Sequence, residues 1–501
     1  MRINDSFDDP VKKNFFRRMA KKASESLSAR IRSVTAFFKQ IPSRCKAFFD
    51  KVKQKVTDFY LTFKEGDIGV KMSYFVMGSG SFAHKRIGNG LTYLAVQLLY
   101  VFYMAFNGIG ALKDFVTLGT EFSYTYYDLS GAGSLTEINV PGDNSMLCLL
   151  YGVVAVVVTI TFVILYLSNI KSARATGLAA KTGQHVPTFR QDIRQLLDSK
   201  FYVLLLVVSL VGVVAFTVMP LIFMILIAFT SYDSQHPETS GFTWVWFQNF
   251  GKMLGTTGLG TTFFPVLGWT LLWAVCATFL NYFLGVGLAL LINNKRVRGK
   301  KLWRTFFVLT IAIPQFTSLL LMRNLLGQYG PVMNILTKIG LERVDWFADK
   351  NAARLIIILV NLWIGIPYSM LITSGILMNI PSDLYESARI DGAGPFRMFQ
   401  KITLPYILFV TGPYLITQFI GNINNFNVIF LLTGGGPFGE LAEGTAGSTS
   451  LLVTWLYQIT TVSGDYNIAS SVGILTFAVC SVIALITFKN TSSVKQEGDF
   501  K

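Results

Sequence analysis

Long apolar runs of about twenty residues recur along most of the chain and alternate with polar segments. Eight runs can be counted, at residues 91–112, 145–168, 201–230, 264–293, 305–322, 355–376, 406–432 and 468–488. A helix of about 20 apolar residues is long enough to cross the hydrocarbon core of a bilayer, which is about 30 Å thick. The pattern therefore predicts an all-α polytopic membrane protein with about eight transmembrane helices.

The charged residues predict how the chain is oriented. Positions 1–90 hold 19 Lys and Arg against 8 Asp and Glu, and the loop after the first run is acidic. Basic residues gather after the second and fourth runs, at Lys171, Arg174, Lys181, Arg190, Arg194, Lys295, Arg296, Arg298, Lys300, Lys301 and Arg304. By the positive-inside rule, both termini and the loops after runs two, four and six are cytoplasmic. The net charge of +16 thus reflects topology, not nucleic-acid binding.

The basic region at 1–90 contains apolar residues at steps of three and four, from Ile31 to Phe63. This spacing predicts an amphipathic helix that Pro42 kinks or divides. Such a helix can lie on an anionic membrane surface. Packing on the protein's own cytoplasmic side, or a partly disordered tail, are the alternatives.

The sequence offers little for catalysis or cofactor binding. The string nearest to a phosphate-binding loop, "GLAAKTG" at 177–183, lacks the second glycine before Lys-Ser/Thr. The four cysteines have no metal-ligand spacing, and the three histidines are scattered outside the apolar runs. We therefore expect a non-catalytic chain that binds no metal and no cofactor of its own.

A patterned polar loop, "DLYESARIDGAGPFRMFQKITLP" at 383–405, separates the sixth and seventh runs. Ser382 or Asp383 can cap a helix that runs to about Ile390. Gly392 then breaks this helix, and Pro395 suits the first turn of a second one. The loop at 377–405 is therefore predicted to be a helix, a tight turn and a second helix on the cytoplasmic side.

The spacing within this loop resembles the E-A-A-x-x-x-G-x(9)-I-x-L-P signature of ABC-importer permeases. The matching residues are Glu386, Ala388, Gly392, Ile402, Leu404 and Pro405, with Ser387 in place of an alanine. Residues 360–370 and 424–437 are similar to the segments that flank this loop in the larger permease subunit of maltose/maltodextrin ABC importers. The likeness covers roughly 200–490 and implies the type I ABC importer permease fold. Two further helices would occupy 91–200, and a cytoplasmic tail 491–501.

The resemblance also assigns a role to the loop. In this family the loop is a coupling helix that sits in a cleft of a separate ATPase subunit and transmits its movement. It implies coupling contacts at Glu386, Ser387, Ala388, Asp391, Gly392 and Ala393. Glu386 would pair with a basic group on the ATPase, and Gly392 would permit the tight turn.

The apolar runs contain no Asp, Glu, Lys or Arg, whereas ion-coupled carriers often keep such residues within the membrane. Their absence points to a neutral cargo and an external energy source. Runs six and seven carry amides and aromatic rings that suit a sugar. The resemblance implies substrate contacts at Asn361, Ile364, Gly365, Tyr368, Gln418, Gly421, Asn422 and Asn425. Gln418 and Gly421 depart from the family's best-known member, which has a serine and a phenylalanine there.

The asparagines have a second interpretation, because amide side chains also join helices to one another in membrane bundles. Sugar contact and interhelical bonding both remain open for Asn422 and Asn425.

The resemblance implies a permease subunit of an ATP-driven maltodextrin importer in the bacterial cell membrane. It further implies a second permease subunit, two ATPase subunits that carry ATP and Mg, and an extracellular sugar-binding protein. The alternatives are an ion-coupled secondary sugar carrier and, less well supported by the sequence, a membrane enzyme.

Overall fold

The computed structural model describes most of the chain, at residues 46, 50–51, 53–120, 124–128, 136–140, 142–183, 188–236, 241–256, 258–294, 296–439 and 446–490. Most of the predicted amphipathic helix lies outside these residues. Its last part is described, and residues 53–65 are helical. The tail at 491–501 also lies outside them. The chain forms two compact units, Met1–Gly110 with Val154–Gly212 and Ala111–Val153 with Val213–Lys501.

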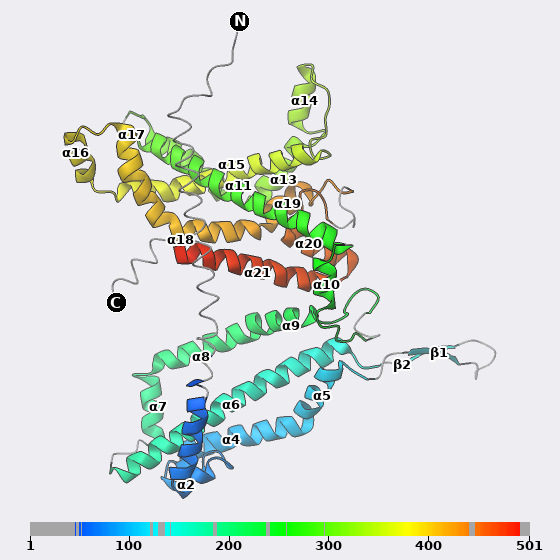
Figure 1. Ribbon diagram of the computed structural model, residues 1–501, viewed down its shortest axis with the longest axis vertical. Coiled ribbons are helices and arrows are strands. Elements are labelled where there is room, and N and C mark those ends of the chain that lie inside the picture. The colour runs from blue at the N-terminus through cyan, green and yellow to red at the C-terminus, as the bar shows by residue number, and fades with distance from the viewer. Residues whose placement is uncertain are drawn as a thin grey trace. The chain divides into compact units, whose positions relative to one another are not determined.

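The regular elements of the first unit, among its described residues, are all helices (Figure 1). Its elements, two of which continue into the second unit, are α2 (Ile68–Met72), α3 (Ser79–Ala83), α4 (Ile87–Tyr103), the π-helical turn η1 (Met104–Gly108), α6 (Ser145–Lys181), α7 (Phe189–Leu197) and α8 (Phe201–Val213). Helix α8 is apolar on all sides and most of its large side chains are exposed. A helix of this kind is stable when lipid surrounds it.

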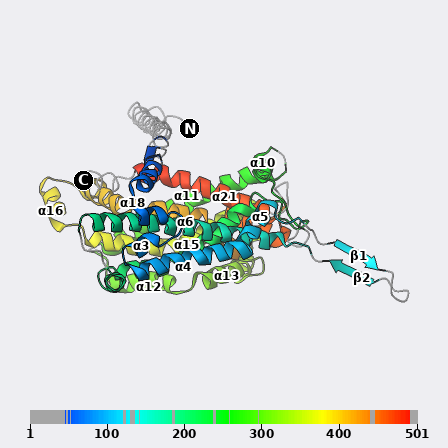
Figure 2. The ribbon, with the colours of Figure 1, turned by 90° about the horizontal axis from the view of Figure 1, so that it is seen from below.

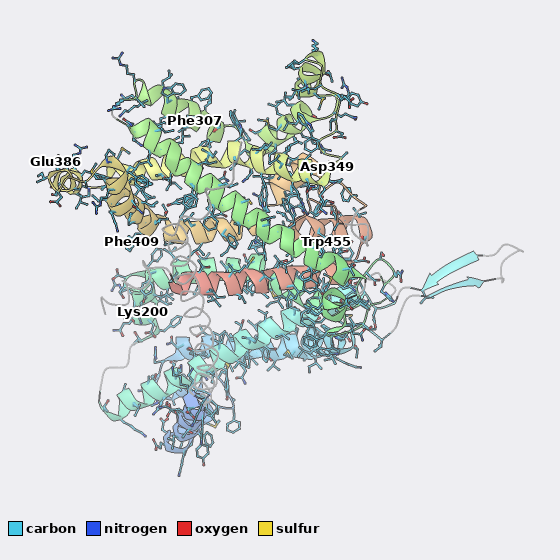
Figure 3. The ribbon with its side chains drawn as sticks, turned by 45° about the horizontal axis from the view of Figure 1, so that its top comes forward. Lys200, Phe307, Asp349, Glu386, Phe409 and Trp455 are labelled. Carbon is cyan, nitrogen blue, oxygen red and sulfur yellow. The ribbon has the colours of Figure 1, made fainter. Side chains whose placement is uncertain are left out.

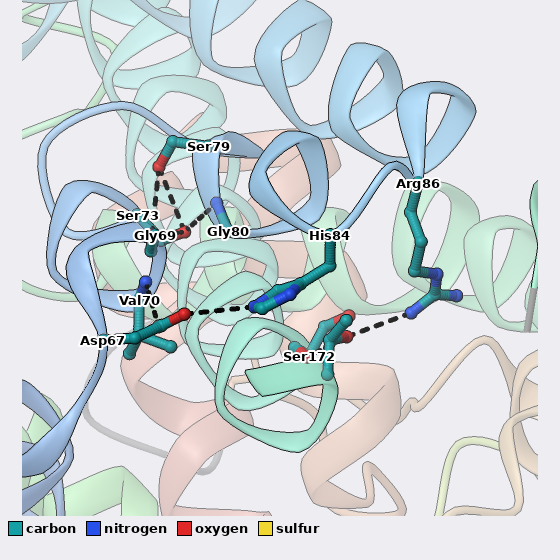
Figure 4. A network of polar contacts seen from close by, with 10 residues as sticks. Asp67, Gly69, Val70, Ser73, Ser79, Gly80, His84, Arg86 and Ser172 are labelled. Carbon is teal, nitrogen blue, oxygen red and sulfur yellow. Dashed lines mark hydrogen bonds and ion pairs between the residues drawn. The ribbon is translucent and has the colours of Figure 1, made fainter. Parts of the chain in front are cut away.

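Polar side chains fix the short helices of this unit to α6. The backbone N–H of Gly78 donates to Asn169 Oδ1 at 3.0 Å, and Asn169 Nδ2 donates to the Ser73 carbonyl at 3.2 Å. Nearby, His84 Nε2 lies 3.2 Å from Asp67 Oδ2 (Figure 4). The Asn169 amide thus pairs two backbone groups of the segment between α2 and α3, the Gly78 N–H and the Ser73 carbonyl, and ties this segment to α6.

The second unit contains the remaining elements: η2 (Val214–Val218), α5 (Ile109–Thr117), β1 (Tyr124–Asp128), β2 (Thr136–Val140), α9 (Met219–Ile227), α10 (Gln248–Leu254), α11 (Leu259–Asn293), α12 (Lys300–Ala312), α13 (Gln315–Leu326), α14 (Pro331–Lys338), α15 (Lys350–Met378), α16 (Ser382–Ile390), α17 (Pro395–Met398), η3 (Phe399–Thr403), α18 (Leu404–Ile423), α19 (Phe426–Thr433), α20 (Leu452–Gln458), η4 (Ile459–Ser463) and α21 (Tyr466–Asn490). The long helices α11, α15 and α18 run alongside one another (Figure 2).

Seven helices among the described residues are long and apolar enough to cross a membrane, and a bent pair makes an eighth if it counts as one span. This agrees with the eight predicted runs. The bent pair, Lys300–Ala312 and Gln315–Lys338, turns by 91°, so the apolar run predicted at 305–322 forms a broken helix, a bend that the sequence analysis did not predict. Pro314 is the cause, because a proline drives the residue before it out of the helical region. Ile313 accordingly has φ −79° and ψ 128°.

A two-stranded antiparallel hairpin interrupts the otherwise helical fold. Strands β1 and β2 pair with Tyr126 opposite Ile138. The helical fold class is confirmed, and the hairpin is an addition that the sequence analysis did not predict in the loop after the first run.

Helices α11 and α15 pack with their backbones in close approach. A Cβ placed on Gly285 would lie 2.4 Å from Ser369 Cβ and 3.0 Å from the Met370 nitrogen, so only glycine fits there. On the neighbouring side, Tyr282 of α11 shares a 2.7 Å hydrogen bond with Thr411 of α18. These contacts bring three long helices together around one cavity.

Candidate functional site: a polar cavity and an exposed loop

A cavity of about 390 Å³ opens between α11, the α12–α13 break, α15 and α18. Pockets of this size are typical of small-molecule sites. Seven predicted substrate residues line it: Asn361, Ile364, Gly365, Tyr368, Gln418, Asn422 and Asn425. Gly421 is exposed and does not line this cavity. Substrate contact stays a prediction for all eight residues.

Helix α15 contributes one face to the cavity, because Asn361, Ile364, Gly365 and Tyr368 follow one another at helical spacing. Asn361 is 5% exposed, and its Nδ2 donates to no acceptor among the described residues. Pro367 lies inside the helix and cannot donate to the carbonyl four residues earlier. That carbonyl belongs to Trp363, another lining residue. The face therefore presents an unpaired amide donor, Asn361 Nδ2, to the cavity.

The asparagines at the end of α18 are tied into the protein. Asn422 Nδ2 donates to Thr278 Oγ1 of α11 at 3.0 Å. Asn425 Nδ2 donates to Asn422 Oδ1 at 3.4 Å, while Asn425 Oδ1 accepts from the Val428 nitrogen and caps α19. The interhelical interpretation of Asn422 is therefore correct for this conformation. It does not preclude substrate contact, because both side chains also line the cavity.

Two other polar and aromatic residues of this region lie elsewhere. Asn424 is exposed and donates to the Ile420 carbonyl, and it does not line the cavity. Phe426 stacks on Phe430 with a ring-centroid distance of 4.7 Å. Neither residue is placed to contact a molecule in the cavity.

Sequence reasoning missed the contributions of α11 and of the helix break. The missed polar lining residues are Thr278, Asn281, Thr310, Gln315 and Ser318. A signal was present, because Asn281 and Tyr282 follow Thr278 by three and four residues in an otherwise apolar run. Gln315 enters the cavity only because the chain bends at Pro314.

The cavity is neutral. None of its described lining residues is Asp, Glu, Lys, Arg or His. Elsewhere in the described chain, no group of three or more His, Cys, Asp and Glu side chains could hold a metal ion. The cavity can therefore hydrogen-bond an uncharged polar molecule and contact its apolar faces through tyrosine and tryptophan rings.

The patterned loop has the predicted shape. Helix α16 is Ser382–Ile390 and α17 begins at Pro395, although Pro381, not Ser382 or Asp383, occupies the N-cap position. Gly392 has φ +74°, a backbone conformation that residues other than Gly, Asn and Asp seldom adopt. This explains a glycine at the turn.

The predicted coupling residues lie together on this loop. Glu386 projects from α16, at the edge of the second unit (Figure 3). Glu386, Ser387, Asp391 and Gly392 are exposed, whereas Ala388 and Ala393 are half-buried and joined by a 2.9 Å bond from the Ala393 nitrogen to the Ala388 carbonyl. Two large apolar side chains, Ile390 and Phe396, are 87% and 76% exposed. The loop thus offers a surface with charged and apolar groups to a partner.

Comparisons with known proteins bear on this arrangement. Residues 281–491 match the family model "Binding-protein-dependent transport system inner membrane component". The chain is 35% identical over 390 residues to the galactooligosaccharides transport system permease protein GanP of Bacillus subtilis, covering 76% of this chain and 93% of the relative. It is 33% identical over 434 residues to the maltodextrin transport system permease protein MdxF of the same organism, covering 84% and 95%.

Two further likenesses are narrower. The maltose/maltodextrin transport system permease protein MalF of Escherichia coli is 36% identical over 248 residues, which is 49% of this chain and 48% of MalF. A chain from the crystal structure of a bacterial ABC transporter involved in the import of the acidic polysaccharide alginate overlays with a TM-score of 0.50 at 24% identity, covering 60% of this chain and 97% of that one. This last likeness shows the fold.

The extensive identity to permease proteins supports the ATP-driven permease over the ion-coupled carrier and the membrane enzyme. The chain belongs to the binding-protein-dependent transport system inner membrane component family, as a non-catalytic permease subunit that spans the cell membrane several times.

Proposed function

We propose that the chain forms the sugar path of an ATP-driven maltodextrin importer. The observation that carries this proposal is the neutral cavity of about 390 Å³, lined by amides, hydroxyls and aromatic rings. Sugars offer hydroxyl groups to amides and flat apolar faces to rings. The seven lining residues that the sequence predicted are the proposed substrate contacts. Gly421 is the eighth, and it has the least support because it does not line the cavity.

Galacto-oligosaccharides are the second candidate cargo. They are the substrate named for the GanP relative, which is 35% identical over 76% of this chain. Maltodextrin is favoured because the named maltodextrin permease MdxF matches a larger share, 84%. Both are uncharged oligosaccharides, and both are compatible with a cavity without charged lining residues.

The exposed loop 382–398 is the proposed docking site for an ATPase subunit. Exposed apolar patches rimmed by polar residues mark protein–protein contacts; Ile390 lies among the coupling residues and Phe396 follows them, and both are largely exposed. In the proposed assembly, two ATPase subunits bind ATP and Mg, Glu386 pairs with a basic group on one of them, and a second permease subunit completes the path. An extracellular binding protein delivers the sugar.

The charge pattern supports a cytoplasmic location for this loop and for both termini. Lys300 and Arg304, at the start of α12, both bond to Asn293 at the end of α11. These cations lie between the fourth and fifth apolar runs, on the side proposed to be cytoplasmic.

Reconstitution tests the proposed function. The chain, its second permease, the ATPase and the binding protein are placed in liposomes, and uptake of labelled maltodextrin and galacto-oligosaccharide is measured with ATP at the ATPase side. We expect ATP-dependent uptake of maltodextrin above that of galacto-oligosaccharide. Equal or greater galacto-oligosaccharide uptake would favour the second candidate, and uptake of neither sugar would contradict the proposal.

A further inference from the structure

Asn281 of α11 lines the cavity with an unsatisfied polar atom. Its Oδ1 is buried and accepts no hydrogen bond from the described residues. Buried carbonyl oxygens are nearly always paired, because leaving one unpaired is unfavourable. A buried amide of this kind in a cavity wall suggests that its partner is a molecule that enters the cavity.

The position of Asn281 depends on Gly365 of α15. A Cβ at position 365 would lie 2.2 Å from Asn281 Nδ2 and 2.4 Å from its Cγ. The Asn281 amide therefore fills the space that any side chain at 365 would occupy. Gly365 makes room for an amide from the neighbouring helix.

Asn361 places a complementary group close by. It precedes Gly365 by four residues and so shares its face of α15, one turn away. Asn361 is 5% exposed, and its Nδ2 is buried with no acceptor among the described residues. An unpaired acceptor on α11 and an unpaired donor on α15 thus meet the same cavity where the two helices touch. A hydroxyl both donates and accepts, so adjacent hydroxyls of one sugar ring can satisfy the two groups.

We propose that Asn281 is a specificity-determining contact for the hydroxyls of a neutral oligosaccharide, and that Gly365 is the positioning residue that admits it. The inference rests on the proposed function and adds a helix, α11, to the substrate-contacting set. It also changes the role of Gly365, whose effect on the substrate passes through the Asn281 amide.

A double-mutant cycle tests this proposal in the complete reconstituted transporter. The variants are Asn281→Ala, Gly365→Ala and the two combined. Gly375→Ala is the matched control, because it lies on the same helix and a Cβ there meets nothing within 4 Å. KM and maximal rate of ATP-driven maltodextrin uptake are measured, normalised to the amount of assembled complex.

We expect Asn281→Ala to raise KM by roughly threefold to tenfold, the range for one lost hydrogen bond, with little change in maximal rate. Gly365→Ala should have a similar effect because it displaces the Asn281 amide. The combined variant should be no worse than Asn281→Ala alone, since coupled residues are not additive. Gly375→Ala should match the wild type.

Three results would overturn the proposal. One is an unchanged KM in Asn281→Ala and in Asn281→Leu. The leucine variant keeps the number of side-chain heavy atoms and the branch at Cγ, and it serves if alanine impairs assembly. Another is multiplication of the two single effects in the combined variant, since Gly365 would then act without Asn281. The third is no uptake by the wild type, which would overturn the proposed function as well; wild-type uptake with unaffected variants would overturn this inference alone.

Discussion

The guanidinium of Arg354 donates two hydrogen bonds to the carbonyl oxygen of Ser448, from Nε at 2.9 Å and from Nη2 at 2.7 Å. It also lies over the Trp269 ring, 4.1 Å from the centroid. Trp269 in turn donates to the Thr449 carbonyl at 3.1 Å. Residues 446–452 are buried, so these bonds supply partners that water cannot. Arg354 and Trp269 therefore hold this segment against α11 and α15.

Replacing Arg354 should loosen that segment. Arg354→Met leaves the buried Ser448 carbonyl without its charged donors, and we expect a loss of about 1.5–3 kcal/mol in the free energy of unfolding. Arg354→Lys should recover only part of this, because lysine lacks the planar fork that donates twice to one oxygen. Thermal unfolding of the purified chain in detergent measures both variants. A wild-type midpoint in Arg354→Met would show that the pair contributes nothing to stability.

Gly392→Asp tests the proposed docking loop. Aspartate tolerates positive φ better than most residues, so the loop should keep its fold while an added charge and side chain block the ATPase. We expect the chain to insert normally and to lose copurification with the ATPase. Gly340→Asp is the matched control, because that glycine has φ +99° and a Cβ there also meets nothing within 4 Å. Retained copurification and sugar-stimulated ATP hydrolysis in Gly392→Asp would argue against docking at this turn.

Asn425 combines a helix cap with a proposed sugar contact, and two substitutions separate these roles. Asn425→Ala removes both the cap on α19 and the amide, and we expect about 1 kcal/mol of lost stability together with a higher KM for uptake. Asn425→Ser keeps a capping oxygen but loses the amide. If the sugar contact is real, the serine variant regains stability and keeps the raised KM. A wild-type KM in Asn425→Ser would mean that only the cap mattered.

Asp465 should make the second unit less stable at neutral pH. Burial raises the pKa of this carboxyl, the like charge of Asp233 adds to the rise, and Lys252 opposes it. A carboxyl whose pKa is higher in the folded state binds protons more readily there, so stability falls as pH rises through that pKa. Asp465→Asn should therefore raise the unfolding midpoint at pH 7, and the difference should shrink as the wild type is protonated at acid pH. A lower midpoint at pH 7 would contradict this sign.

The sequence predicted the features that depend on local pattern. The length of the apolar runs predicted the spanning helices. Gly392, which breaks a helix, and Pro395, which suits a first turn, predicted the turn between α16 and α17. These features arise from residues close together in the chain. Their physical causes, hydrophobic length and backbone restriction, can be read without tertiary structure.

Features that depend on neighbouring helices were harder to predict. Asn281 lines the cavity because α11 packs beside Gly365 of α15, and this packing is not encoded in the residues next to Asn281 in the chain. Pro314 indicates a helix break, but it lies within a continuous apolar run, which by its length alone predicts one spanning helix. Asn422 shows the remaining ambiguity, because one amide both joins α18 to α11 and faces the cavity.

A structure of the assembled transporter with maltodextrin bound tests the account most directly. We predict that sugar occupies the cavity between α11, α15 and α18, in contact with Asn361 and Asn425, while the loop carrying Glu386 sits in a cleft of the ATPase. Sugar bound outside this cavity, or a loop that touches no ATPase, would contradict the account.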